Sequence, residues 1–244
     1  MQEQNRNERH RSIYDHLVRQ VSTLLSAWEL YKSIYHDDPE TRGLLSRSDH
    51  RFFSFTYAVY GYHLVLGISK LLDPAKIHGN DNLVLAQLFP SPDVSPKDRI
   101  KKLEDRLHQL EQNRSQAGEN ASDSLLSEIE TTTTYLSHAR HLERIHDMAS
   151  PIRQARHKYI AHQDLARCFN SDEIRDFTLG VKHDDIHDVL ASIIQFLKKF
   201  GKIHHKHALV GFHLELSSRD HKDRGLVNSL RKAEAYERLV EDSD

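Results

Sequence analysis

The sequence contains a single cysteine, Cys168, and few glycines and prolines, 9 and 6 in 244 residues. One cysteine excludes an intramolecular disulfide and a cysteine-based metal cluster, which fits a reducing compartment such as the cytoplasm. Because glycine and proline interrupt helices and mark turns, their scarcity favours long helices. The formal net charge of −2 excludes a globally basic nucleic-acid-binding protein but leaves room for a local basic patch.

Long apolar segments are equally scarce. The N-terminus, MQEQNRNERHRS, lacks the apolar core of a secretory signal. Only residues 52–69 form a run of eighteen residues without a formal charge, the length at which a membrane span becomes conceivable. This run contains His63 and three tyrosines. We therefore interpret it as a buried core helix and expect a cytoplasmic protein without a membrane segment.

Apolar residues recur at intervals of three or four over most of the chain, which predicts an all-α protein. The inward residues of the first helix, about residues 8–35, are predicted to be Ile13, Leu17, Val21, Leu24, Trp28, Tyr31 and Tyr35. Those of the second helix are Phe52, Phe55, Val59, His63 and Leu66. Further helices are expected over residues 83–89, from residue 100 to 110, over 123–148, from Ser150-Pro151 onward, and from Asp184 or Asp185 through Phe200. The inward residues of the last of these are predicted to be Ile186, Val189, Leu190, Ile193, Leu197 and Phe200.

Helix ends and loops follow from the polar residues. Ser48 or Asp49, Asn82 and Ser150 are predicted N-caps, and residues 36–43 and 111–124 are predicted loops. Alternation of apolar residues over 210–216 predicts a short strand, followed by a helix over 223–240. We expect a helical bundle over residues 1–207, with residues 208–244 as a C-terminal extended segment plus helix that is part of the same domain or a short appendage.

Two related segments carry the candidate chemistry: RHLERIH at residues 140–146 and RHKYIAHQD at residues 156–164. Both lie in a stretch rich in arginine, lysine and histidine. At about 100° per residue, Arg140 points away from the apolar face of its helix, whereas Arg156 and His162 border one apolar face. The first segment is therefore interpreted as a solvated basic helix face and the second as a candidate cleft, although such edge residues can equally be paired in a purely structural role.

The string RHKYIAHQD, near the start of a helix preceded by Ser-Pro, resembles the ribonuclease motif of the HEPN superfamily: arginine, a polar residue, and histidine after four to six intervening positions. The aromatic run RFFSFTYAVYGYHLVLGISKLLD, the segment DNLVLAQLF and Trp28 in a long first helix are similar to the abortive-infection U-type branch of that superfamily. The resemblance spans roughly residues 10–205. It implies a HEPN-like helical bundle.

The resemblance also implies a metal-independent endoribonuclease that acts as a toxin or phage-defence effector, with Arg156 and His162 as catalytic residues. RNA carries its own nucleophile, the 2′-hydroxyl, so cleavage needs a proton acceptor, a proton donor and positive charge on the phosphate. One Arg–His pair leaves the second proton-transfer group unaccounted for, and a homodimer would supply it. The candidate supporting residues are Arg153, His157, Lys158, Tyr159 and Asp164.

The expected partners are RNA, a second copy of the chain and, by analogy with defence systems, an antitoxin protein; no cofactor is expected. In HEPN toxins silenced by a nucleotidyltransferase, a tyrosine follows the motif histidine by two residues. This chain has Asp164 at that position. The sequence therefore does not support regulation through such a tyrosine.

Two alternatives remain open. In HDDIHD, residues 183–188, His183 and His187 lie one helical turn apart among acids, as in a metal site, but acids at a helix start are expected as caps and dipole partners. The stronger alternative is a catalytically inactive HEPN domain that acts as an RNA-binding or protein-interaction module, because fold alone does not establish activity.

Overall fold

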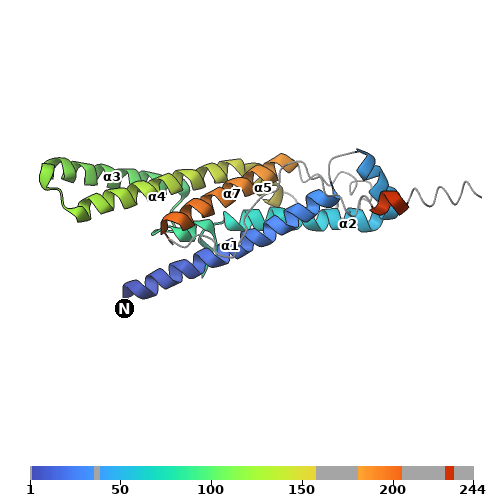
Figure 1. Cartoon of the computed structure of the whole chain (residues 1–244), viewed down its shortest axis with the longest axis horizontal. Coiled ribbons are helices and arrows are strands. Elements are labelled where there is room, and N and C mark those ends of the chain that lie inside the picture. The colour runs from blue at the N-terminus through green and yellow to red at the C-terminus, as the bar shows by residue number, and fades with distance from the viewer. Residues whose placement is uncertain (1, 36–38, 78, 158–180, 205–228, 234–244) are drawn as a thin grey trace, which may run out of the picture.

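The computed structural model describes residues 2–35, 39–77, 79–157, 181–204 and 229–233. The described chain is almost entirely helical, which confirms the all-α prediction (Figure 1). The long helices are α1 (Gln2–Ile34), α2 (Pro39–Leu71), α3 (Pro96–Ala117), α4 (Asp123–Met148) and α7 (His183–His204), with the short α5 (Ser150–Ala155) after α4. Between α2 and α3 lie the paired two-residue strands β1 (Lys76–Ile77) and β2 (Asn80–Asp81) and the 3₁₀ turn η1 (Leu85–Leu88).

The core forms where α1, α2, α4, α5 and α7 pack against one another. The predicted inward residues of α1 are buried, apart from the partly buried Ile13, and those of α7 are buried throughout. α3 pairs with α4 as a hairpin that extends from the bundle (Figure 1). The helix–helix packing of this core places α5, which directly precedes the RHKYIAHQD segment, against α2, α4 and α7.

α2 is oriented differently from the sequence prediction. Phe52, Phe55, Val59, His63 and Leu66 were expected to face the core, and all five are exposed. From Phe52 to Leu71, the buried apolar side chains of α2 are Phe53, Leu64, Val65, Ile68 and Leu71. The prediction was wrong because α2 is apolar on both faces, so periodicity alone cannot tell which face its neighbours cover.

The predicted cap at Asp49 is confirmed, but the loop before it is not. Asp49 has non-helical backbone angles (φ −162°, ψ 89°), and its Oδ1 accepts a hydrogen bond from the Phe52 backbone N–H at 3.0 Å. The residues from Pro39 to Ser48 are helical rather than part of a loop, so α2 consists of two helical segments joined by a kink. Proline at the first position of a helix lacks only an N–H that would be unpaired there.

Three further local predictions were wrong. Asn82 does not cap a helix; its side-chain amide donates to the Pro74 carbonyl, and η1 has no side-chain cap. Most of the predicted loop 111–124 is helical, since α3 continues to Ala117 and the 3₁₀ turn η2 (Gly118–Asn120) follows at once. Ser150 is the first residue of α5 rather than its cap.

Membrane and C-terminal predictions have different outcomes. Among the described helices, α2 included, none combines the length and apolar character that a membrane span requires. The predicted strand at 210–216 lies outside the described residues, as does most of the predicted helix over 223–240. Residues 229–233 of that helix are helical, and Leu230 packs against the core.

We expect Gly67→Ala to destabilise the fold, because the added methyl group would overlap the Leu24 side chain of α1. The free energy of unfolding should fall by about 1–3 kcal/mol, as for other overpacked cores. Gly43→Ala on the same helix is the control, since its new methyl group meets only the end of the Arg47 side chain. Denaturant unfolding followed by circular dichroism measures both variants, and an unchanged stability of Gly67→Ala would contradict this packing.

Buried histidines make stability depend on pH. Burial, followed by the nearby His141 and Lys199, lowers the pKa of His138 from 6.5 to about 4. In the unfolded chain the same side chain binds a proton near pH 6.5. The contribution of the uncharged His138 to the free energy of unfolding is therefore complete above pH 6.5 and is lost as the pH falls toward 4. We expect unfolding titrations to show a loss of about 1 kcal/mol per pH unit in this window. His138→Phe should flatten this slope, whereas the exposed His50→Phe should leave it unchanged.

Candidate functional site

The best-defined polar contact of the RHKYIAHQD segment joins Arg156 to Asp73. The Nη1 group of Arg156 donates to Oδ1 of Asp73 at 2.6 Å, between side chains that are 34% and 15% exposed. Asp73 lies two residues after the end of α2, and Arg156 directly follows α5. Residues 83 positions apart in the sequence are therefore held together at the junction of α2 and α5.

The burial of α5 explains why Arg156 lies at an edge. Ile152 and Ala155 are buried in the core, which anchors the inner face of the helix. Arg156 is half-buried beside them, and His157 is exposed. Arg156 and His157 continue the helix as a π-helical turn, a geometry that is frequent at functional sites.

The Asp73 contact leaves most of the arginine's hydrogen-bonding capacity for another anion. A guanidinium has five N–H donors arranged as a planar fork. Among the described residues, Asp73 is the one that hydrogen-bonds this fork, through Nη1. The remaining donors can bind a carboxylate or phosphate with two parallel hydrogen bonds.

Part of the predicted site lies outside the described residues, namely Lys158, Tyr159, His162 and Asp164. The structure places Arg153, Arg156 and His157, and Arg156 contacts the carboxylate of Asp73, which is not among the residues predicted for the site. The predicted cleft between Arg156 and His162 therefore stays a prediction.

The RHLERIH segment differs from the candidate motif as its helix geometry predicted. Arg140 is exposed and forms an ion pair with Glu104 of α3 at 2.8 Å, between side chains that are 57% and 46% exposed. His146 lies at the other edge, where Arg153 donates to its Nδ1 at 3.5 Å. Burial lowers the pKa of His146 to about 4, with further contributions from Arg153 and Arg99. At neutral pH this histidine is uncharged and accepts from the arginine.

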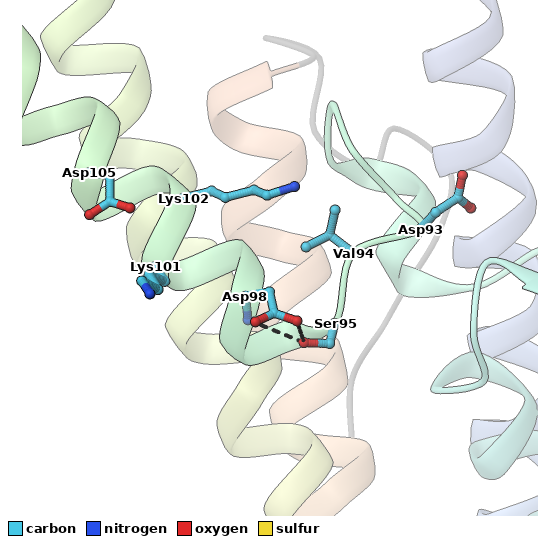
Figure 2. A pocket seen from close by; sticks show the side chains of 7 residues that line it. All are labelled: Asp93, Val94, Ser95, Asp98, Lys101, Lys102 and Asp105. Atoms are coloured by element: carbon cyan, nitrogen blue, oxygen red, sulfur yellow. Dashed lines mark hydrogen bonds between the residues drawn. The ribbon is translucent and has the colours of Figure 1, made fainter.

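A surface hollow lies at the start of α3, away from the motif residues in sequence. Figure 2 shows its lining, with Ser95 hydrogen-bonded to Asp98 at the beginning of the helix. Its lining residues are Asp93, Val94, Ser95, Asp98, Lys101, Lys102 and Asp105. These alternating charges are typical of a solvated helix start, where serine and aspartate pair with free backbone N–H groups.

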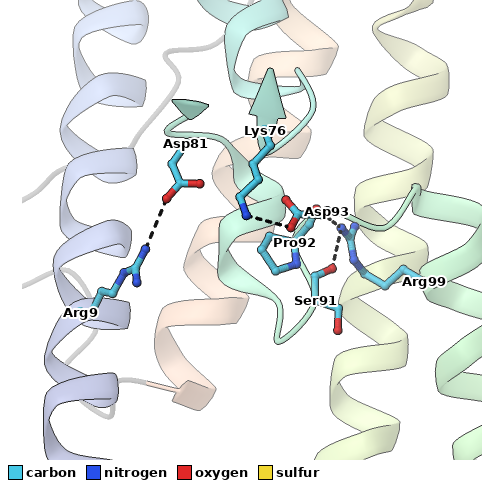
Figure 3. Close-up of polar contacts among 7 residues, drawn as sticks. All are labelled: Arg9, Lys76, Asp81, Ser91, Pro92, Asp93 and Arg99. Carbon is cyan, nitrogen blue, oxygen red and sulfur yellow. Dashed lines mark hydrogen bonds and ion pairs between the residues drawn. The ribbon is translucent and has the colours of Figure 1, made fainter. Parts of the chain in front are cut away.

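Arg99 fixes the loop that leads into this helix. Its guanidinium is buried, and Figure 3 shows it donating to the backbone carbonyls of Ser91 at 3.4 Å and Pro92 at 3.0 Å. It also donates to the backbone carbonyl of Val94 at 2.8 Å. Its carbon atom Cζ lies 4.6 Å from the centre of the Phe89 ring. Burial lowers the pKa of Arg99 to about 10. These contacts use the arginine in a structural role, in contrast to the half-exposed Arg156.

The two histidines of HDDIHD pack against aromatic side chains of the core. His183 hydrogen-bonds the Tyr31 hydroxyl at 2.8 Å, and its ring lies edge-on to Trp28 at 6.0 Å. His187 also contacts the Trp28 ring, at 6.4 Å between centroids. The described residues contain no group of three or more histidine, cysteine, aspartate or glutamate side chains placed to hold a metal ion. These contacts account for His183 and His187 as aromatic packing partners.

Sequence reasoning missed Asp73 and the buried His138 and His141. Asp73 is the last residue of the aromatic run RFFSFTYAVYGYHLVLGISKLLD, and this position is the only feature of the sequence that points to it as a site residue. His138 contacts the rings of Phe196 and Phe200, and His141 hydrogen-bonds the Ser192 hydroxyl at 3.1 Å. Neither arrangement can be read from spacing, because both depend on α7 packing against α4.

Comparison with known proteins supports the resemblance over most of the chain. The family model of the HEPN domain of AbiU2 matches residues 8–223. No curated protein and no solved structure matches the chain. The matched range contains α1 from residue 8 onward, the helices from α2 to α7, the Asp73–Arg156 pair and the complete RHKYIAHQD segment. The chain therefore belongs to the AbiU2 family of HEPN domains.

Proposed function

We propose that this protein is a metal-independent endoribonuclease of the HEPN type, acting as a toxin or phage-defence effector. The geometry of Arg156 is the observation that best supports the proposal. Its guanidinium is half-exposed at the end of α5 and held on one side by Asp73. A guanidinium oriented in this way presents its other donors to a phosphate group.

The proposed reaction uses the 2′-hydroxyl of RNA as the nucleophile. His162 accepts the hydroxyl proton while the 2′ oxygen forms a bond to phosphorus and the bond from phosphorus to the 5′ oxygen breaks. Arg156 stabilises the negative charge that builds on the phosphate oxygens. The departing 5′ oxygen receives a proton, which gives a 2′,3′-cyclic phosphate and a 5′-hydroxyl. Each step uses a protein side chain or RNA itself, so no metal ion is required.

A second copy of the chain completes the proposed site. One copy contributes one Arg156 and one His162, whereas the reaction needs a group that accepts a proton and another that donates one. The supporting residues Arg153, His157, Lys158, Tyr159 and Asp164 surround the same stretch of chain, and their basic members bind neighbouring RNA phosphates. The proposed assembly is a homodimer with RNA as substrate, and an antitoxin protein is the proposed partner in the cell.

The first test compares RNA cleavage by the wild type, Arg156→Ala and His162→Ala. Labelled structured and single-stranded RNAs are incubated with purified protein in EDTA. We expect Arg156→Ala to reduce the cleavage rate about 10²-fold to 10³-fold, as for removal of an anion-stabilising donor. His162→Ala should reduce it about 10²-fold to 10⁴-fold, because proton transfer is lost.

Arg140→Ala is the matched control, since Arg140 begins the related RHLERIH segment and forms an exposed ion pair. Its cleavage rate should stay within about twofold of the wild type, because exposed ion pairs contribute little. Cleavage that persists in both site variants would disprove the assignment. A wild type that binds RNA without cutting it would favour the binding-module alternative.

The second test removes the negative charge of Asp73. Asp73→Asn should lower kcat/KM for RNA by about 10-fold to 100-fold, because a misplaced catalytic group loses much of its effect. Asp73→Glu should restore part of the activity, since it retains the carboxylate. Glu104→Gln, which removes the acidic partner of Arg140, is the control. Unfolding midpoints of all variants separate a misplaced arginine from a loss of fold, and full activity of Asp73→Asn would show that Arg156 needs no partner.

A further inference from the structure

The outer face of α2 carries an exposed apolar seam, which we define as Phe52, Phe55, Val59 and Leu66. Their exposed fractions are 56%, 68%, 46% and 38%. The opposite face of the same helix is buried in the core. Single exposed apolar residues are common on proteins, but a continuous row on one helix face marks an interaction surface.

The spacing of the seam matches that of a helix pair. Positions 52, 59 and 66 are seven residues apart, and position 55 lies three residues after the first of them. In heptad notation these are a, d, a and a positions, and the partly buried Tyr62 occupies the d position between Val59 and Leu66. The next d position, Ser69, is buried, so the seam ends at Leu66. Such a pattern is complementary to another copy of itself, because a and d residues of two helices interlock.

The seam leads to the candidate site. α2 ends at Leu71, and Asp73 follows it and hydrogen-bonds Arg156. A partner helix that runs parallel to α2 along the seam would therefore end beside the same Asp73–Arg156 pair. An antiparallel partner centred on Val59 would instead place the two pairs at opposite ends, about 40 Å apart at 1.5 Å per residue.

We propose that the seam is the interface with a second copy of this chain, paired in parallel about a two-fold axis. The inference rests on the proposed function, in which two copies complete one site, because only parallel pairing brings both arginines to one end. Parallel pairing also avoids repulsion at the first flanking pair, where the exposed cation Arg51 at a g position lies opposite the uncharged Thr56 of the other copy at an e position.

Disulfide crosslinking tests both the surface and the direction. Phe52→Cys, Val59→Cys and Leu66→Cys are made separately in a Cys168→Ser protein, which has no other cysteine. In parallel pairing each new cysteine meets its own equivalent, so mild oxidation should yield a covalent dimer with all three variants. Leu126→Cys, at a 40% exposed leucine on the α3–α4 hairpin, is the control and should stay monomeric on a non-reducing gel.

Two outcomes would overturn the proposal. Crosslinking of Val59→Cys alone indicates antiparallel pairing, and crosslinking no stronger than that of Leu126→Cys shows that the seam does not join two copies. Crosslinking does not depend on RNA cleavage. If the wild type does not cleave RNA but the cysteine variants crosslink, the proposed function is rejected and the proposed interface stands.

Charge substitutions test the same interface without oxidation. Leu66→Glu lies on the exposed face, so its circular dichroism should match the wild type, whereas parallel pairing would place two glutamates together. We expect sedimentation to show the dimer dissociation constant raised at least 10-fold. Mixing Leu66→Glu with Leu66→Lys should restore the dimer, because opposite charges then meet. The parallel register would be contradicted if this mixture formed no dimer while a mixture of Leu66→Lys with Phe52→Glu did.

Discussion

The arrangement of the bundle depends on the burial of one face of α7 against α1, α4 and α5. Near its C-terminal end, Phe196 and Phe200 are fully buried and contact the ring of His138 on α4. Near its beginning, His183 contacts the aromatic side chains of α1. Since this packing also holds α5, it determines where the RHKYIAHQD segment starts and which of its residues reach the surface.

The candidate site uses that scaffold to place a charged group at the boundary between core and solvent. A guanidinium deep in the core would serve structure, as Arg99 does with its backbone carbonyls. A guanidinium that is mostly exposed, such as that of Arg140, forms an ion pair that solvent screens. Arg156 lies between these cases, where Asp73 can orient it and a phosphate can still approach.

The two copies of the Arg-His pattern show how far local spacing determines a site. Both have the same interval between arginine and the second histidine; RHLERIH lies on α4, and Arg156 directly follows α5. Their arginines differ because α3 covers one face of α4, so that Arg140 meets Glu104, whereas α5 turns toward the end of α2, so that Arg156 meets Asp73. The environment of each arginine is thus set by the neighbouring helix.

From sequence alone, the helical class, the inward faces of α1 and α7, the Asp49 cap and the edge position of Arg156 could be predicted, because each follows from local periodicity or capping chemistry. The family resemblance, too, was visible in short strings. Only the tertiary structure decided which face of α2 is buried, that Asp73 pairs with Arg156, and that His138 and His141 lie in the core. These features depend on contacts between residues far apart in the chain, and an apolar helix with two equivalent faces carries no local signal for choosing between them.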